Sequence, residues 1–215
     1  MAVTLPNGAL VAIAASYGSS QATTVLTNAN PGVATITSHG YTNGDIVEIS
    51  SGWSRLTDKL VRVASSTSNT FALEGINTTS TSVYPAGSGL GTARKITAWT
   101  QLSQILESTS SGGEQQFTEY QFLEADAQRR IPTFKTPFGL QFLVADDPAL
   151  AGYILAETAN DDRLQRGVRI TLPSGALIFY NAYVSLNKTP RMTVNQPLAV
   201  QVTLSLLNEP VRYAS

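Results

Sequence analysis

The stretches FGLQFLVADDPALAGYILAETAN, residues 138–160, and GVRITLPSGALIFYNAYVSL, residues 167–186, carry the strongest structural signal in this 215-residue chain. They predict a strand, a helix, a second strand, a tight turn and a third strand. Pro and Gly in LPSG suit the two central positions of such a turn. Because one amphipathic helix cannot bury its apolar stripe alone, we expect it to lie on the sheet that these strands form.

The helix is expected to begin at Asp146 or Asp147, either of which can cap the free amides of its first turn. Pro148 then stands where a missing N–H costs nothing. The stripe expected to face the sheet consists of Leu150, Ala151, Ile154 and Leu155. Capping and solvation account for the acidic pairs 146–147 and 161–162, so we do not assign them a catalytic role.

Outside this region, residues 198–206 alternate most regularly, with Leu and Val on one face and Gln201, Thr203 and Ser205 on the other. This pattern predicts a long strand that is half buried and half exposed to water. Residues 94–104 and 117–124 predict two further strands. Between them, residues 107–116 are polar and contain two glycines, which predicts a long loop that becomes ordered on assembly.

Residues 28–92 differ in texture, because short strands alternate with stretches rich in Ser, Thr, Asn and Gly. Strands are expected at 33–38, 46–50, 59–64 and 70–73. We interpret the segment as an inserted small β-barrel or meander module, which leaves residues 1–27 and 93–215 as the main domain. His39-Gly40, Gly44-Asp45, Trp53 and the NTFAL at 69–73 resemble a small barrel module that recurs in phage structural proteins.

Composition excludes several functions. Charged residues make up 13% of the chain and the net charge is −1, so the basic stripe needed for tight nucleic-acid binding is missing. The chain has no cysteine and one histidine, His39, which argues against thiolate metal sites and nucleophilic triads. No apolar run is long enough to span a membrane as a helix. We therefore expect neither an enzyme nor a cofactor.

Aromatic rings and cationic side chains gather between residues 117 and 137, and both are enriched in protein interfaces. We expect a subunit interface here, although a solvated loop with one buried Phe explains residues 125–137 equally well. The predicted interface residues are Phe117, Tyr120, Phe122, Arg129, Arg130, Phe134 and Lys135.

Four stretches, taken with the order of the elements, resemble the tail tube proteins of long-tailed, siphovirus-like bacteriophages. They are ITAWTQL at 96–102, the loop at 107–116, ADDP at 145–148 and RITLPSGALIFYNAYVS at 169–185. The resemblance covers residues 1–27 and 93–215. It implies a mainly β fold, a β-sandwich or barrel with one helix on the sheet, that forms hexameric rings. Stacked rings would make a conduit for DNA during genome delivery.

The same resemblance implies a virion tail protein that is assembled in the bacterial host cytoplasm. Its partners would be further copies of itself, a tape measure protein, and tail terminator or baseplate proteins, while DNA passes without specific binding. Residues 96–215 contain eleven acidic and nine basic side chains, so a lumen built from them would not trap DNA. We expect the row Gln201, Thr203 and Ser205 to face the lumen and the module to project outward.

An alternative from another class is a β-sandwich that binds carbohydrate or a host surface. In that case Trp53, Trp99 and several tyrosines would stack on sugar rings. A row of exposed aromatic side chains would favour this alternative, whereas aromatic residues at buried, alternating positions would favour the structural role.

Overall fold

A computed structural model describes residues 5–214, so the first four residues of the predicted main domain and the final Ser215 lie outside the described part. Strands dominate it, with a single helix, α1 (Ala151–Asp162). The strands are β1 (Leu10–Tyr17), β2 (Gln21–Thr23), β3 (Val25–Leu26), β4 (Val33–Thr35), β5 (Ile46–Ser51), β6 (Lys59–Ala64), β7 (Thr70–Leu73), β8 (Gly91–Leu102), β9 (Ile105–Ser111), β10 (Gln115–Tyr120), β11 (Arg129–Lys135), β12 (Gly139–Ala145), β13 (Gln165–Thr171), β14 (Leu177–Arg191), β15 (Ala199–Leu206) and β16 (Val211–Tyr213).

Most of the strands join one antiparallel sheet in the order β3-β4-β7-β6-β5-β8-β1-β13-β14-β15-β12-β9, while β2 pairs with β8 and β16 with β14. Strands β10 and β11 form a separate two-stranded sheet. The mainly β fold with one helix on the sheet is confirmed. The strands predicted at 46–50, 59–64, 70–73, 94–104 and 198–206 are also confirmed, with ends shifted by a few residues.

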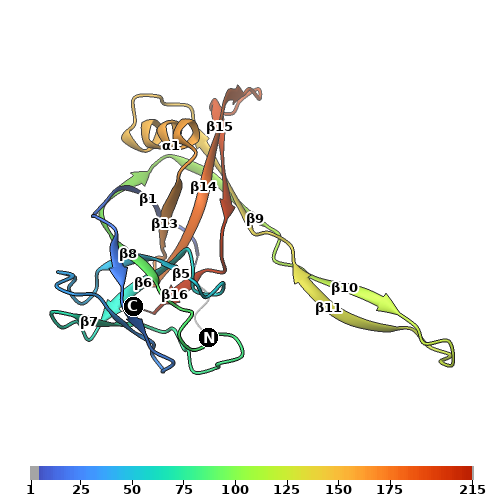
Figure 1. The fold of residues 1–215 in the computed structure, drawn as a ribbon. Coiled ribbons are helices and arrows are strands. Elements are labelled where there is room, and N and C mark those ends of the chain that lie inside the picture. Colours follow the sequence, from blue (N-terminus) through green and yellow to red (C-terminus); the bar gives the residue numbers. More distant parts are fainter. Residues whose placement is uncertain (1–4, 215) are drawn as a thin grey trace.

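Helix α1 covers one face of the sheet, which carries the first hydrophobic core (Figure 1). Small residues of the helix face this core. A Cβ atom on Gly152 would lie 2.4 Å from the carbonyl oxygen of Gln101 on β8, so the helix backbone packs directly on the strand. The buried helix residues are Gly152, Tyr153, Ala156 and Ala159.

Two predictions about this helix were wrong. It begins after Leu150, without a side-chain cap, because Asp147 closes a separate turn by accepting a hydrogen bond from the Ala149 amide at 3.2 Å. The predicted stripe is also not the buried face, since Ile154 is 50% exposed. Close backbone approach requires small side chains, and the larger aliphatic residues lie at the margins of the contact.

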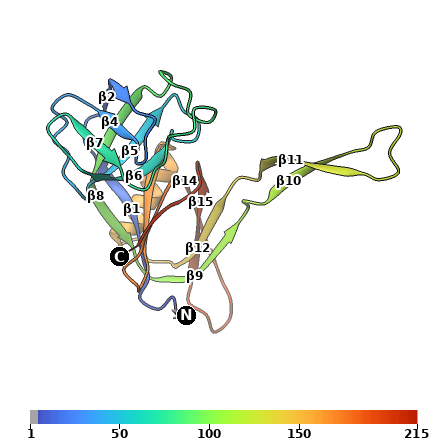
Figure 2. The same ribbon diagram turned by 90° about the horizontal axis from the view of Figure 1, so that it is seen from below.

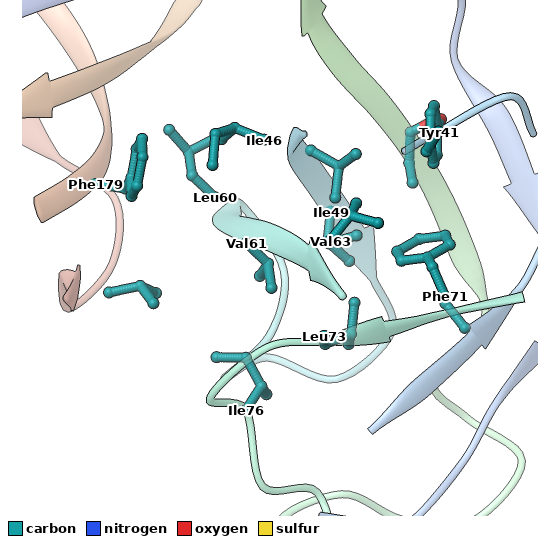
Figure 3. Packing of buried hydrophobic residues seen from close by; sticks show 14 of the residues in the cluster. Tyr41, Ile46, Ile49, Leu60, Val61, Val63, Phe71, Leu73, Ile76 and Phe179 are labelled. Carbon is teal, nitrogen blue, oxygen red and sulfur yellow. The ribbon is translucent and has the colours of Figure 1, made fainter. Parts of the chain in front are cut away.

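The second core lies on the opposite face of the same sheet, beneath strands of segment 28–92 (Figure 3). Leu60 of β6 and Ile96 of β8 pack over Gly167 of β13, where a Cβ atom would lie 2.9 Å and 2.8 Å from their Cδ1 atoms. Phe179 of β14 closes this core from the side of the main sheet. The module residues and the main sheet therefore share one continuous core.

Polar contacts hold segment 28–92 to its neighbours as well. The buried carboxylate of Glu48 accepts hydrogen bonds from Arg94 at 2.9 Å and from Gln165. At the other end, the Tyr213 hydroxyl accepts a hydrogen bond from the Arg62 amide at 2.8 Å and donates one to the Glu74 carbonyl at 3.1 Å. Burial raises the pKa of Tyr213 to about 12, so this hydroxyl keeps its proton at physiological pH.

The largest departure from expectation lies between residues 105 and 135. The predicted loop 107–116 is wrong, because residues 105–111 form β9, which pairs with β12. The alternative for residues 125–137, a solvated loop with one buried Phe, is also wrong, because Arg129–Lys135 form β11, which pairs with β10, and Phe134 is exposed. This two-stranded hairpin projects away from the body of the protein (Figures 1 and 2). Pro132 fits because a two-stranded ribbon leaves one edge of each strand unpaired.

Candidate assembly surfaces

The first candidate surface is an open, polar part of the main sheet, which we call the polar face. Along β14 the side chains on one face change from buried Phe179 and Asn181 to exposed Tyr183, Ser185 and Asn187. The segment 28–92 covers this face at one end and leaves the rest open to solvent. The polar face consists of Glu107, Thr109, Ser111, Gly139, Gln141, Leu143, Tyr183, Ser185, Asn187, Arg191, Gln201, Thr203 and Ser205.

The predicted row on β15 lies at the centre of this polar face. Thr203 is opposite Gln141 of β12 and Ser185 of β14, and Gln201 and Ser205 continue the row on either side. The alternate residues of β15, Val200, Val202 and Leu204, are buried in the core under helix α1. The sequence thus predicted the alternation correctly, and the register shows which residues accompany the row.

Charge on the polar face is sparse and nearly balanced. Glu107 of β9 and Arg191 at the end of β14 line one shallow groove of about 180 Å³ together with Gln141 and Gln201. Other members of the face are neutral. The surface is therefore hydrophilic without a cationic stripe of the kind that binds phosphates.

The polar face ends at an open strand edge. Within residues 5–214, β9 is the last strand of the sheet and pairs only with β12. An unpaired edge presents free backbone N–H and C=O groups, which form a ready template for another strand. Five of its seven side chains are polar, so sequence patterning missed both the strand and its place on the same face as the predicted row.

The β10–β11 hairpin is the second candidate surface, and it brings the predicted interface residues together. Phe117, Tyr120, Arg129, Arg130, Phe134 and Lys135 all lie on its two strands, and Phe122 lies at its tip. Phe117 is 55% exposed and Phe134 is 67% exposed, which is unusual for such large apolar side chains. Leu123 at the tip and Ile131 on β11 are also exposed, and both were missed from the sequence.

Each side of the hairpin carries exposed apolar groups. The register places Phe117 opposite Pro132, and Glu119 opposite Arg130, with which it forms an ion pair at 2.6 Å. Tyr120 opposite Arg129 lies on the other side. A ribbon of two strands has no third layer to cover these groups, so both sides remain available for contact.

The hairpin meets the body through an ion pair at its base. The Lys135 ammonium contacts the carboxylate of Glu209, which lies in the connection from β15 to β16. This contact with Lys135 holds the pKa of Glu209 below its usual range. Both side chains are about half exposed, so the pair orients the hairpin more than it stabilises the fold.

The residues considered for chemistry occupy structural positions. His39 is buried against Tyr41 and Phe71, and its Nδ1 accepts a hydrogen bond from the Tyr41 amide at 2.9 Å. Asp162 pairs with Arg166, and Asp161 lies 3.6 Å from Lys188. In the part of the chain that the structure describes, His and acidic side chains form no group of three able to hold a metal ion. Helix α1 is also too short to cross a membrane.

Neither of the tryptophans predicted to stack on sugar rings is exposed. Trp53 is 1% exposed, and its indole Nε1–H donates a hydrogen bond to the Pro85 carbonyl at 2.8 Å. The guanidinium of Arg169 covers Trp99, with the Arg169 Cζ atom 5.0 Å from the centre of the Trp99 ring. The exposed aromatic side chains belong instead to the hairpin and to Tyr183 on the polar face.

These features define a β-sheet protein with an open polar face, an open edge and an uncovered hairpin. A sequence profile of phage tail tube proteins matches residues 51–215. The chain belongs to this family, whose members are structural components of the viral tail. The matched region begins in β5 and so includes part of the predicted insertion; the division into two domains stays a prediction.

Two solved assemblies contain chains with a similar arrangement of elements. One is the sheath–tube complex of an extracellular contractile injection system in its extended state, with 13% identity, a TM-score of 0.35, and coverage of 50% of this chain and 80% of that chain. The other is the tube-terminating cap of the anti-feeding prophage, with 15% identity, a TM-score of 0.34, and coverage of 50% and 79%. A search of curated protein sequences found no match.

Proposed function

We propose that this tail tube protein closes into hexameric rings, and that stacked rings form a conduit through which DNA passes during genome delivery. The observation that carries the proposal is the polar face, a water-exposed set of four strands that ends at the open edge of β9. In such a ring, the β9 edge of each subunit would lie against the next subunit, which would cover the edge. The polar faces would then join into one inner wall.

The composition of the polar face suits a conduit for DNA. A wall with many cationic groups would hold DNA by releasing counterions, and each added phosphate contact would strengthen binding. Glu107 and Arg191 balance each other on this face, and its remaining side chains are neutral. DNA would therefore slide past Gln201, Thr203 and Ser205 without specific binding.

Hairpin β10–β11 supplies the contacts between subunits in this proposal. Its exposed Phe117 and Phe134 lie on a ribbon that extends beyond the body, so they reach a neighbouring subunit (Figure 2). Segment 28–92 lies on the outside of the tube. The tube ends would meet a tape measure protein and terminator or baseplate proteins, and the whole would assemble in the host cytoplasm before it joins the virion.

Single cysteines test the placement of the polar face, because the natural chain contains none. Thr203→Cys should react with a polymer-linked maleimide in dissociated subunits and should be protected in tubes. Ser68→Cys, at an exposed position in segment 28–92, should react in both states. Equal labelling of Thr203→Cys in tubes and in free subunits would place this face outside the lumen and refute the proposed wall.

Removing the hairpin tests its part in assembly. Residues 115–135 are replaced by a short glycine-containing turn, which leaves β9 and β12 intact. The subunit should keep its circular dichroism spectrum and should form no tubes by negative-stain microscopy. Normal tubes from this variant would show that the hairpin is not an assembly element.

A further inference from the structure

A groove at the base of the hairpin takes no part in the proposed inner wall. It has a volume of about 860 Å³ and lies between segment 28–92, the start of the hairpin and the connection from β15 to β16. Asn208 donates a hydrogen bond to the Thr57 carbonyl and holds two of these walls together. Its lining includes Arg55, Lys59, Tyr84, Lys135, Phe138 and Glu209.

The groove carries an excess of positive charge. Glu209 pairs with Lys135, and within residues 5–214 neither Arg55 nor Lys59 forms an ion pair. Burial lowers the pKa of Lys59, an effect that nearby Glu209 opposes and Arg55 increases. Half-buried rings of Tyr84 and Phe138 add an apolar part to the lining. The groove is thus suited to a segment that combines acidic and apolar side chains.

The tip of the hairpin has this composition. Residues 121–128 read QFLEADAQ, with two acids, Glu124 and Asp126, and no cation. Leu123 is fully exposed, and Phe122 is half exposed beside Tyr120. The Ala125 amide donates to the Phe122 carbonyl at 3.0 Å, and Gln121 Nε2 donates to the Ala125 carbonyl at 2.7 Å. These bonds shape the tip before any partner binds, which lowers the entropy cost of binding.

The tip cannot reach the groove of its own molecule. The seven residues of β11 separate the two and span about 23 Å at 3.3 Å per residue. The ribbon points away from the body along its whole length (Figures 1 and 2). An occupant with the composition of the tip must therefore come from another molecule.

We propose that the hairpin tip of one subunit docks into the basic groove of a second copy of this chain. Glu124 and Asp126 face Arg55 and Lys59, while Leu123 and Phe122 contact Tyr84 and Phe138. The inference rests on the proposed tube function and names where the hairpin binds. The contact is heterologous because the tip and the groove are different surfaces. Each copy can therefore bind one neighbour through its tip and another through its groove.

Charge reversal tests this contact. The tip variant Glu124→Lys/Asp126→Lys and the groove variant Arg55→Glu/Lys59→Glu should each weaken self-association at least tenfold, measured by sedimentation velocity. An equimolar mixture should associate again. In the mixture an acidic tip meets a basic groove and a basic tip meets an acidic groove, so both contacts regain opposite charges. A single chain that carries all four substitutions should also self-associate.

Controls separate this contact from folding and from the proposed function. Arg163→Glu, exposed beyond the end of α1, makes a charge reversal outside the groove and should leave association unchanged. Arg55→Glu alone repeats the test without altering the half-buried Lys59, and thermal unfolding verifies that each variant folds. If each charge-reversal variant by itself still forms tubes like those of the wild type, or if the mixture stays dissociated, the docking contact is refuted and the proposed conduit is not. Restored association without tubes from any form would support docking and refute the conduit.

Discussion

Segment 28–92 and the β10–β11 hairpin both depart from the main sheet, yet their aromatic residues have opposite environments. Trp53 and Phe71 in the segment are 1% and 0% exposed, whereas Phe117 and Phe134 in the hairpin are 55% and 67% exposed. The segment joins the main sheet through β5 and β8 and packs on its face. The hairpin consists of two strands, and within residues 5–214 no other element packs on either of its sides. Residues of the same type thus stabilise the subunit in one region and remain available to another molecule in the other.

This difference follows from the number of layers. Two strands alone are marginally stable in water, because no third element buries their side chains. We therefore expect a segment with this geometry and five exposed large apolar side chains to gain its stability on assembly. Substitutions in the two regions should therefore have different effects. Those in the anchored regions should lower the free energy of unfolding, and those in the hairpin should lower the affinity between subunits.

The largest loss of stability is expected from Phe71→Ala. Phe71 is fully buried and makes edge-to-face contacts with Tyr41 and His39, at 5.5 Å and 5.2 Å between ring centres. Truncation leaves a cavity and should lower the free energy of unfolding by about 3–5 kcal/mol. Urea denaturation of dissociated subunits measures it. A loss below about 1 kcal/mol would mean that segment 28–92 is not anchored as described.

The helix provides a second test of tight packing. Helix propensity alone predicts that Gly152→Ala stabilises by about 1 kcal/mol. The contact with the Gln101 carbonyl predicts the opposite, a loss of about 1–3 kcal/mol, because a backbone oxygen cannot rotate away. Ile154→Asp is the matched control on the exposed side of the helix and should stay within about 0.5 kcal/mol. If Gly152→Ala is the more stable protein in urea, the helix does not lie against β8.

The sequence predicted the elements better than their contacts. Alternation identified β15 and the row Gln201, Thr203 and Ser205 because large apolar residues separate these positions. Strand β9 has no such signal, since only Ile105 of ILESTSS is partly buried and the other six residues are exposed. Its pairing with β12 depends on backbone hydrogen bonds. The prediction of the buried face of the helix was wrong because close packing requires small residues there. Small residues such as Gly and Ala do not stand out in a hydrophobicity pattern. The contact of Lys135 with Glu209 joins distant residues and leaves no local pattern.

The ion pair at the base of the hairpin should have a small effect that depends on pH. Lys135 lowers the pKa of folded Glu209, so the stabilisation is complete above the usual range for a glutamate. It is lost as the pH falls through the lowered pKa. Since both side chains are about half exposed, Glu209→Gln should cost less than about 1 kcal/mol at pH 7 and nothing at pH 2. A difference that grows towards low pH in urea titrations would contradict this assignment.

The hairpin aromatics provide the sharpest test of the comparison, because their expected effect on subunit stability is close to zero. Phe117→Thr/Phe134→Thr keeps strand propensity and removes two rings that contact no core, so the free energy of unfolding should stay within about 0.5 kcal/mol. Tubes should be lost by negative-stain microscopy, because aromatic anchors in interfaces are each worth about 2 kcal/mol or more. Val25→Thr/Leu164→Thr removes two other exposed apolar side chains and should leave the tubes intact. If the hairpin variant instead unfolds more easily and still assembles, its rings belong to the subunit rather than to the interface, and the distinction between the two regions is wrong.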